Sequence, residues 1–300
     1  MSSVGPAKTP KSRTQKSRQY PLARQPPSSM VVAEKRDKTL CVLITGASRG
    51  IGLELVKQYL LRVGRGNYGR GGHVIACARD PDKSMDLLRC FTVDYVSYEL
   101  VPLDVTDPGS FGDLHEHLQD LDRIKELDGV PQKIDIVFNN AGVALGRDCS
   151  LGTVDYDAWR TSFDTNVMGA VRVVETVLPH LADDATIVNV SSGLGSIGRV
   201  MNGGFNTLTQ DVIYRSTKAA LNMTTACCAA ELRARAPDKA IKVVSIDPGW
   251  VNTDMGSRGG TVKPPLEPEQ VVRGMIDVVA GLKPEDSGKF LSWEGAEMPW

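Results

Sequence analysis

A tyrosine and a lysine lie four positions apart in the stretch DVIYRSTKAALN, residues 211–222. If this stretch is helical, Tyr214 and Lys218 share one helix face. A phenol has an ordinary pKa of about 10, and a neighbouring ammonium lowers that pKa by stabilising the phenolate. A tyrosine tuned in this way can act as a general acid toward a carbonyl oxygen. The spacing alone also fits a solvated surface pair, although the alanines further along the stretch favour close packing.

Two serines end an apolar run that precedes this pair in the chain. The stretch IVNVSSG, residues 187–193, is typical of a buried strand that ends at Ser191 and Ser192. In an open parallel sheet, ligands bind outside the carboxyl ends of the strands. We therefore expect these hydroxyl groups to lie beside a ligand.

A glycine-rich segment, TGASRGIG at 45–52, joins an apolar run to a helical pattern. Gly46 permits the turn, Gly50 lets the backbone approach a pyrophosphate, and Gly52 allows close packing of helix on strand. The helix N-terminus adds free N–H donors and the positive end of its dipole. A tight structural turn is the alternative, but the strand–turn–helix context favours a dinucleotide site.

The end of the second apolar run bears on which dinucleotide binds. NAD enzymes usually carry an acidic residue there, which holds the ribose 2′-hydroxyl. This sequence reads HVIACARD, with Arg79 at that end, and Arg49 in the glycine turn adds a second guanidinium. Arginine suits a 2′-phosphate, so NADP is favoured. Asp80 argues the other way, unless it caps the next helix.

Short apolar runs alternate with helical patterns from residue 39 onward, which predicts an α/β fold. Runs that are apolar on both faces indicate a parallel sheet covered by helices on both sides. With right-handed crossovers, we expect one doubly wound Rossmann domain with a seven-stranded, mostly parallel sheet. GKFLSW near the end could form the last edge strand. The other strands are expected at 39–45, 73–78, 98–103, 134–139, 186–190 and 241–246.

Residues 1–38 differ in charge from the rest of the chain. They hold nine Lys or Arg against two acidic residues, a net charge of +7, whereas the remainder is −8. Without an apolar core segment this stretch is no secretory signal. We predict a disordered basic leader at 1–38 and one domain at 39–300, with an organelle transit peptide as the alternative for the leader. Glycine-rich insertions at 62–72 and 256–265 are expected to be loops.

Composition argues against several classes of protein. The acidic body disfavours nucleic acid as a partner, and no apolar run reaches the length of a membrane span. Six cysteines lack C-x-x-C spacing and the four histidines do not cluster, so we predict no metal site. Free cysteines fit a reducing compartment, which favours a cytoplasmic location, or an organelle if the leader is a transit peptide.

Four motifs taken together resemble the short-chain dehydrogenase/reductase superfamily. They are TGASRGIG (45–52), NNAG (139–142), VNVSS (188–192) and YRSTK (214–218), and the resemblance covers residues 39 to about 255. It implies a catalytic tetrad. Tyr214 would be the acid/base, Lys218 would lower its pKa and bind the nicotinamide ribose, Ser192 would polarise the substrate carbonyl, and Asn166 would hold a relay water.

The resemblance also implies a set of cofactor contacts from the glycine turn, two strand ends, NNAG and the DPGWVNT segment. Asp104 could instead cap the stretch TDPGSF, and a Pro-Gly pair is also a common turn. The implied contacts are Gly46, Ser48, Arg49, Gly50, Ile51, Gly52, Arg79, Asp104, Val105, Asn140, Tyr214, Lys218, Pro248, Gly249, Val251 and Thr253.

Within the superfamily, IDPGWVNTDMG and the ending GKFLSWEGAEMPW resemble the carbonyl-reductase branch that includes sniffer and the bacterial C-factor proteins. This implies NADPH-dependent reduction of a ketone or aldehyde. The alternatives are an NAD-linked alcohol dehydrogenase and a non-catalytic dinucleotide-binding signalling protein. Relatives pair through their two long helices, here about 157–181 and 211–235, which implies a homodimer or homotetramer. The segment between Ser192 and Tyr214 is expected to shape the substrate mouth.

Overall fold

The structure is a computed structural model that describes residues 40–63, 72–91, 97–128, 133–147, 149–203 and 211–300. The predicted leader at 1–38 lies outside the described residues, as does most of the insertion at 62–72. Residues 37–300 form one compact unit.

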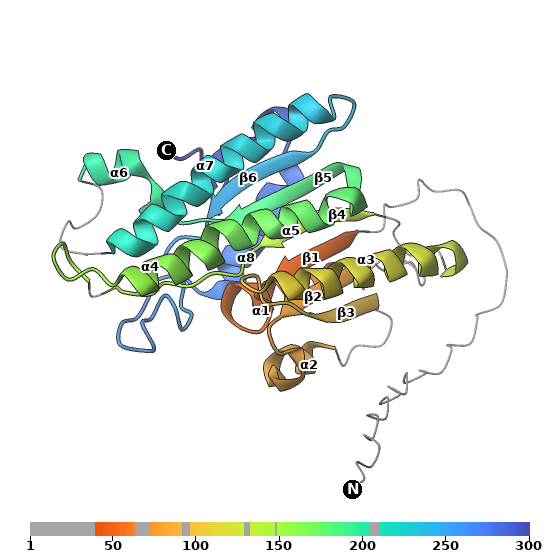
Figure 1. The fold of residues 1–300 in the computed structure, drawn as a ribbon, viewed down its shortest axis with the longest axis horizontal. Helices are drawn as coiled ribbons and strands as arrows, with labels where there is room; N and C mark the ends of the chain where they lie inside the picture. The colour runs from red at the N-terminus through yellow and green to blue at the C-terminus, as the bar shows by residue number, and fades with distance from the viewer. Residues whose placement is uncertain (1–39, 64–71, 92–96, 129–132, 148, 204–210) are drawn as a thin grey trace, which may run out of the picture. The chain divides into compact units, whose positions relative to one another are not determined.

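A seven-stranded sheet forms the centre of the described part, with strand order β3-β2-β1-β4-β5-β6-β7 (Figure 1). Every pairing between these strands is parallel, which confirms the predicted doubly wound α/β fold. The GKFLSW segment supplies the edge strand β7, as predicted. The strands are β1 (Cys41–Thr45), β2 (His73–Ala78), β3 (Ser97–Pro102), β4 (Ile134–Asn139), β5 (Leu181–Val190), β6 (Lys242–Asp247) and β7 (Phe290–Ser292).

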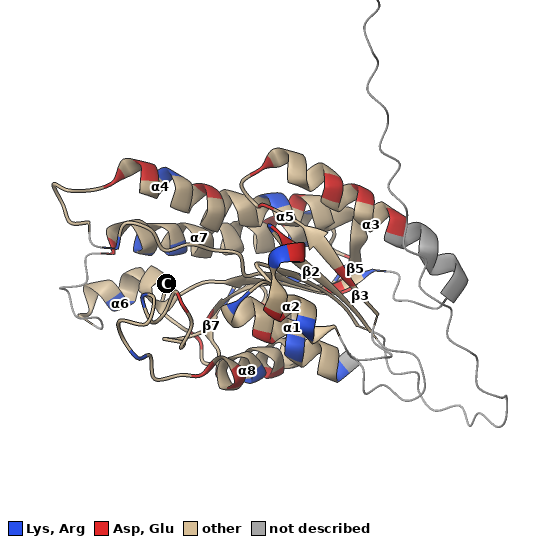
Figure 2. Ribbon diagram, turned by 90° about the horizontal axis from the view of Figure 1, so that it is seen from below, with Lys and Arg blue, Asp and Glu red and all other residues tan. Residues whose placement is uncertain are grey.

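Helices cover both faces of the sheet. One layer contains α3, α4, α5 and α7 and the other contains α1, α2 and α8, and many of the charged residues belong to the helices (Figure 2). Within the described ranges, none of the helices is long and apolar enough to cross a membrane. The helices are α1 (Gly50–Val63), α2 (Met85–Cys90), α3 (Pro108–Asp128), α4 (Tyr156–Phe163), α5 (Gly169–Val177), α6 (Ile197–Met201), α7 (Val212–Arg235) and α8 (Pro268–Gly281), with a π-helical turn η2 (Asp164–Met168) and short 3₁₀ turns η1 (Pro81–Lys83), η3 (Leu178–His180), η4 (Gly193–Gly195) and η5 (Pro284–Asp286).

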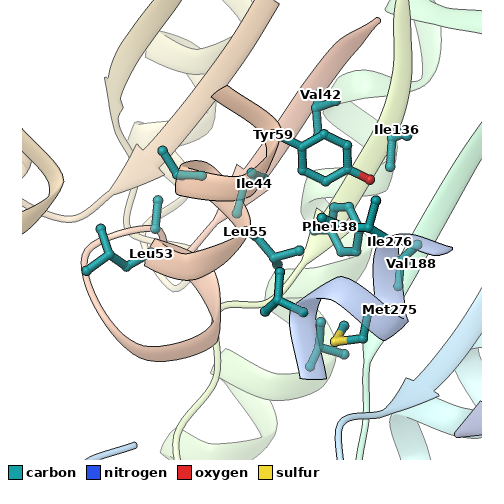
Figure 3. Packing of buried hydrophobic residues seen from close by; sticks show 14 of the residues in the cluster. Val42, Ile44, Leu53, Leu55, Tyr59, Ile136, Phe138, Val188, Met275 and Ile276 are labelled. Carbon is teal, nitrogen blue, oxygen red and sulfur yellow. The ribbon is translucent and has the colours of Figure 1, made fainter. Parts of the chain in front are cut away.

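The sheet buries side chains on both faces because successive residues of a strand point to opposite sides. In β1, Val42 and Ile44 belong to the core beneath α1 and α8, whereas Leu43 belongs to the core beneath the other layer. Tyr59 of α1 packs on Phe138 of β4 with ring centroids 5.7 Å apart (Figure 3). The apolar runs of the sequence therefore form two cores that fix the sheet from both sides.

A partly buried ionic cluster lies on the β3 side of the sheet. Glu99 of β3 forms an ion pair with His117 of α3, and its carboxylate is 3.8 Å from His73 Nε2 on β2. Burial favours the neutral carboxyl, but hydrogen bonds and charges of the two histidines prevail and lower the pKa of Glu99 to about 2. The hydrogen bond to Glu99 raises the pKa of His117.

The chain order reverses between β1 and β4. From β1 the chain builds outward through β2 and β3, and from β4 it builds in the other direction through β5, β6 and β7. The crevice outside the carboxyl ends of strands at such a switch point is where open α/β sheets bind ligands. The predicted motifs follow these strand ends.

Candidate active site

The glycine turn is held in place by the NNAG segment. The Nδ2 atom of Asn140 donates to the carbonyl oxygens of Thr45 and Gly46, at 2.9 and 3.2 Å. The hydroxyl of Thr45 accepts from the backbone N–H groups of Asn140 and Ala141, both at 3.1 Å. The side chain of Asn140, expected to anchor the adenosine, is thus used to position the turn.

The backbone of the turn fits a phosphate group. A Cβ atom at Gly52 would lie 2.5 Å from Asn140 Nδ2 and closer still to the Gly46 carbonyl oxygen, so only glycine allows this approach. Gly50 has φ +57°, and the nearest atom to a Cβ there would be Thr253 Cγ2, at 3.3 Å. The turn therefore faces the segment after β6 across the crevice, with the N–H groups of α1 available to an anion.

Other residues of the turn have distinct surroundings. Ser48 is half-buried, Arg49 is exposed, and Ile51 packs against the core beneath α1. An ion pair of 3.5 Å joins Arg49 to Asp254, beyond β6. This contact links the two sides of the crevice at its solvent-exposed rim.

The end of β2 carries a free guanidinium and an engaged carboxylate. Arg79 is exposed, whereas Asp80 binds Lys83, and this hydrogen bond lowers the pKa of Asp80. The hydroxyl of Ser84 also donates to the carbonyl oxygen of Asp80, at 2.8 Å. Asp80 is therefore used locally, which leaves Arg79 as the charged group of this strand end.

Asp104 and Val105 follow β3 and serve local packing. The carboxylate of Asp104 accepts from the backbone and hydroxyl of Thr106, at 2.9 and 2.7 Å. Burial favours the neutral form of Asp104, but these bonds and the charge of Arg79 leave its pKa below the ordinary value. Val105 packs so closely on Gly169 that a Cβ there would lie 2.8 Å from Val105 Cγ2.

The segment after β6 turns back over the crevice. Pro248 is buried, and Gly249 has φ +75° and donates its N–H to Asp247 Oδ1, at 3.0 Å. Val251 is buried and forms an isolated bridge with Leu266. This bridge fixes the segment so that Thr253 lies opposite Gly50.

Tyr214 and Lys218 are both buried at the carboxyl edge of β5, with 9% and 5% of their surfaces exposed. The ammonium of Lys218 donates to the carbonyl oxygen of Val190, at 2.8 Å, and lies 5.8 Å from the centroid of the Tyr214 ring. Of the two serines that follow β5, Ser192 is the one whose hydroxyl acts to lower the pKa of Tyr214. Ser191 instead donates to Asn222 Oδ1, at 2.6 Å.

The electrostatics of the pair differ from the sequence-based expectation. Burial raises the pKa of Tyr214 to about 12, and the charge of Arg147 and the hydrogen bond with Ser192 oppose this only in part. Burial lowers the pKa of Lys218 to about 8. The reason is that the lysine is itself removed from water and directs its ammonium to Val190, so its charge does not offset the burial of the phenol.

Asn166 bridges two elements of the site. It lies in η2, between α4 and α5, with 1% of its surface exposed. Its Oδ1 accepts from Val143 N–H at 2.8 Å, and its Nδ2 donates to the Val143 carbonyl and to the hydroxyl of Thr217, at 2.9 and 3.0 Å. Thr217 in turn donates to the carbonyl oxygen of Tyr214, at 2.8 Å. The side chain expected to hold a water therefore ties the NNAG segment to the turn of α7 that carries Tyr214.

Several buried polar residues were not predicted from the sequence. Asn139 donates to Asn189 at 2.9 Å, and Asn189 donates to Thr225 at 2.8 Å. The hydroxyl of Thr225 is 2.8 Å from that of Ser245. This polar line runs from β4 through β5 and α7 to β6, and joins the strands behind the site. Its members stand in apolar runs, so strand periodicity gave no sign of it.

An apolar pocket of about 590 Å³ lies beside α7. Its α7 residues, Val212, Arg215, Ser216 and Ala219, are on the face turned away from Tyr214, since successive residues are about 100° apart around a helix. It includes neither Tyr214, Lys218 nor Ser192, so it is separate from the groups that could do chemistry. The remaining lining residues are Cys149, Ser150, Leu151, Leu194, Gly195, Ser196, Ile197, Val200, Met201 and Asp211.

Comparison with known proteins identifies relatives over most of the described chain. The family described as short chain dehydrogenase matches residues 40–261. The C-signal protein of Myxococcus xanthus is 39% identical over 169 residues, covering 56% of this chain and 93% of that protein. The NADPH-bound carbonyl reductase from chicken fatty liver is 31% identical, with a TM-score of 0.72, covering 88% of this chain and all of that one. Carbonyl reductase Sniffer of D. melanogaster is 26% identical, with a TM-score of 0.71 and coverage of 87% and 100%.

Proposed function

The chain belongs to the short chain dehydrogenases, an oxidoreductase family, and from this premise we propose that it reduces a ketone or aldehyde to the alcohol with NADPH. The observation that carries the proposal is the phenol of Tyr214, buried at the carboxyl edge of the sheet with the ammonium of Lys218 5.8 Å from its ring centroid. The glycine turn opens toward the same crevice. The likeness to two carbonyl reductases supports the same reaction.

The choice of NADPH rests on the end of β2. Arg79 is exposed there, and Asp80 is engaged by Lys83, so a 2′-phosphate would meet a guanidinium and not a free carboxylate. The N-terminus of α1 follows the glycine turn, and its N–H groups would bind the pyrophosphate. The carbonyl reductase from chicken fatty liver has NADPH bound, which supports this choice. The bound cofactor supplies the hydride.

Tyr214 is suited to give a proton to the carbonyl oxygen of the substrate. A phenol is protonated at neutral pH at its ordinary pKa of about 10, and this is the form that a reduction requires. Burial raises the pKa of Tyr214 to about 12 and so keeps it in that form. Ser192, whose hydroxyl acts on the pKa of Tyr214, would share the substrate oxygen and stabilise the charge that develops on it. Lys218 holds the end of β5 through Val190 and would bind a ribose hydroxyl of the cofactor.

Asn166 has a positioning role in this proposal. Its side chain connects Val143, after the NNAG segment, to Thr217, one turn along α7 from Tyr214. The connection fixes the phenol relative to the wall of the crevice. Precise placement of this kind contributes strongly to rate, because the reacting atoms must meet in a near-attack geometry.

The two alternatives are weaker on specific grounds. An NAD-linked dehydrogenase usually carries an acidic residue at the end of the second strand, whereas the exposed residue there is Arg79. A non-catalytic signalling role, which the name of the C-signal relative brings to mind, does not account for the four tetrad residues lying together with their hydrogen bonds intact. Reduction accounts for both observations.

The test is Tyr214→Phe, with Tyr156→Phe as the control because Tyr156 is an exposed tyrosine on α4. NADPH oxidation is followed with a panel of quinones, aromatic aldehydes and ketones. We expect Tyr214→Phe to lower kcat by about 100-fold or more, the usual contribution of a general acid, with little change in the Kd for NADPH. The control should match the wild type. Full turnover by Tyr214→Phe would refute the proposal.

A further inference from the structure

A guanidinium lies beside the proposed acid, on the loop that follows the NNAG segment. The Cζ atom of Arg147 is 5.8 Å from the centroid of the Tyr214 ring. The loop is fixed there by the preceding Gly146, which has φ +61° and lies so close to Ile213 that a Cβ would be 2.6 Å from Ile213 Cδ1. The packing of Gly146 on Ile213 therefore holds Arg147 beside Tyr214.

The charge of Arg147 has no carboxylate partner among the described residues. Its Nη1 donates to the Met255 carbonyl oxygen, at 2.7 Å, and its Nε is buried without a hydrogen-bond partner. Burying part of a cation without an anion is unfavourable unless another group completes the site. Arg147 is thus a half-buried guanidinium beside Tyr214 whose charge is not balanced by any carboxylate of the described residues.

Two aspartates act on the pKa of Tyr214 through their charge, and each lies within 4 Å of an arginine, although Oδ1 of Asp211 is buried without a hydrogen-bond partner. Asp247 accepts from the backbone of Gly249 and lies 3.8 Å from Arg199, and Asp211 lies 3.9 Å from Arg258. Each of those arginines thus has an acidic partner within 4 Å, in contrast to Arg147. Within the described ranges, neither of these carboxylates is therefore the partner of Arg147.

We propose that Arg147 binds a carboxylate of the carbonyl substrate, so that the enzyme acts on oxo acids whose carboxylate lies close to the reacting carbonyl. This inference rests on the proposed reduction and names its substrate class. A planar guanidinium can bind a carboxylate through two parallel hydrogen bonds, which would also fix the carbonyl relative to Tyr214. In the reaction, the carbonyl carbon gains a hydride from NADPH, which becomes NADP⁺, and the oxygen gains a proton through Tyr214. The C=O π bond is lost, C–H and O–H bonds form, and the carboxylate is unchanged.

The test compares an acid with its ester, benzoylformate and methyl benzoylformate, which share the same ketone. We expect the wild type to prefer the acid in kcat/KM. Arg147→Gln should lower kcat/KM for the acid by about 30-fold or more, in line with the loss of one partner of a desolvated charge pair, and should change the value for the ester far less. Arg147→Lys should fall between the two, because it keeps the charge and loses the fork.

Arg199→Gln is the matched control, since it removes a guanidinium that already has a carboxylate partner. It should affect acid and ester equally. A wild type that does not prefer the acid, or an Arg147→Gln variant that retains the preference, would overturn the inference while leaving the proposed reduction in place. An increase in the Kd for NADPH in Arg147→Gln, with the preference retained, would assign Arg147 to the cofactor and also overturn it.

A binding measurement separates this inference from the proposed function. Calorimetry with the complex of protein and NADP⁺ compares mandelate with mandelamide, which differ in the carboxylate. We expect mandelate to bind more tightly, and Arg147→Gln to remove the difference. If no carbonyl compound is reduced, the proposed function fails, but this comparison still decides whether Arg147 binds a carboxylate. If Arg147→Gln does not fold, Arg147→Lys and the amide comparison decide the matter: equal binding of both ligands by the wild type overturns the inference.

Discussion

Replacement of Asn166 by alanine tests whether this residue acts through its hydrogen bonds within the protein or through a water. The side chain makes three hydrogen bonds, two to the backbone of Val143 and one to Thr217. Asn166→Ala removes all three and leaves the N–H and the carbonyl of Val143 without these partners. The bridge between the NNAG segment and α7 is lost with them.

The expected loss of stability follows from these contacts. A hydrogen bond contributes about 0.5–1.5 kcal/mol net, and a buried group left without a partner costs about 1–3 kcal/mol. For Asn166→Ala we expect the free energy of unfolding to fall by about 3 kcal/mol, which corresponds to a decrease in Tm of roughly 6–10 °C for a domain of this size. The activity at low temperature should also fall, because the turn of α7 that carries Tyr214 and Thr217 loses its connection to Val143.

The assay is thermal and urea unfolding of Asn166→Ala, Thr217→Val and the double variant. Asn166 and Thr217 share one hydrogen bond, which each single substitution removes. The losses in free energy of unfolding of the two single variants should therefore add up to about 1 kcal/mol more than the loss in the double variant. The control is Thr165→Ala, whose hydroxyl donates only to the Thr161 carbonyl within the same helical segment. An unchanged Tm in Asn166→Ala together with a lost kcat would refute the bridging role and favour a bound water.

Three further predictions concern the glycine turn, the end of β2 and the ionic cluster on β3. Gly52→Ala should raise the Kd for NADPH by about 10-fold or more, because the turn must shift to accommodate the Cβ atom. The control is Gly112→Ala, which has open space around it and should leave the Kd unchanged while stabilising α3 by about 0.5–1 kcal/mol. Fluorescence titration measures the Kd and urea unfolding measures the stability. Arg79→Asp should lower kcat/KM for NADPH by about 10- to 100-fold relative to NADH, and an unchanged ratio would contradict the assignment of the 2′-phosphate to this strand end. Glu99→Gln should lower the free energy of unfolding by about 2 kcal/mol at pH 6. Because the pKa of Glu99 is lowered and that of His117 is raised, this difference should shrink as pH falls from about 4.5 toward 2 and as pH rises above the pKa of His117; urea unfolding at three pH values detects it, and a constant difference would count against the cluster.

Much of the fold could be read from the sequence because strand signals here are local. Six apolar runs and GKFLSW all became strands, with ends shifted by a few residues, since burial on both faces requires apolar residues at nearly every position. The choice of Ser192 over Ser191 stays a prediction; in the structure Ser191 donates to Asn222. The strands depend on residues adjacent in sequence, and the choice between the two serines depends on the order of the motifs.

The parts of the site that escaped prediction depend on contacts between distant segments. Arg147 lies in a loop with no recognisable pattern, and only the packing of Gly146 on Ile213 brings it to Tyr214. The π-helical turn at Asn166 and its bond to Thr217 join residues 51 positions apart. Spacing suggested that Lys218 tunes the phenol, but burial of both groups, which no local pattern reveals, determines their pKa values.

The polar line behind the site restricts how this chain can diverge from its relatives. Thr225 donates its hydrogen to the Leu221 carbonyl, so it can only accept from Asn189 and from Ser245. The direction of every hydrogen in the line is therefore set by one hydroxyl. A substitution at any one of these residues leaves its neighbour buried without a hydrogen-bond partner. Related proteins should therefore have either matched replacements at several of these positions or none.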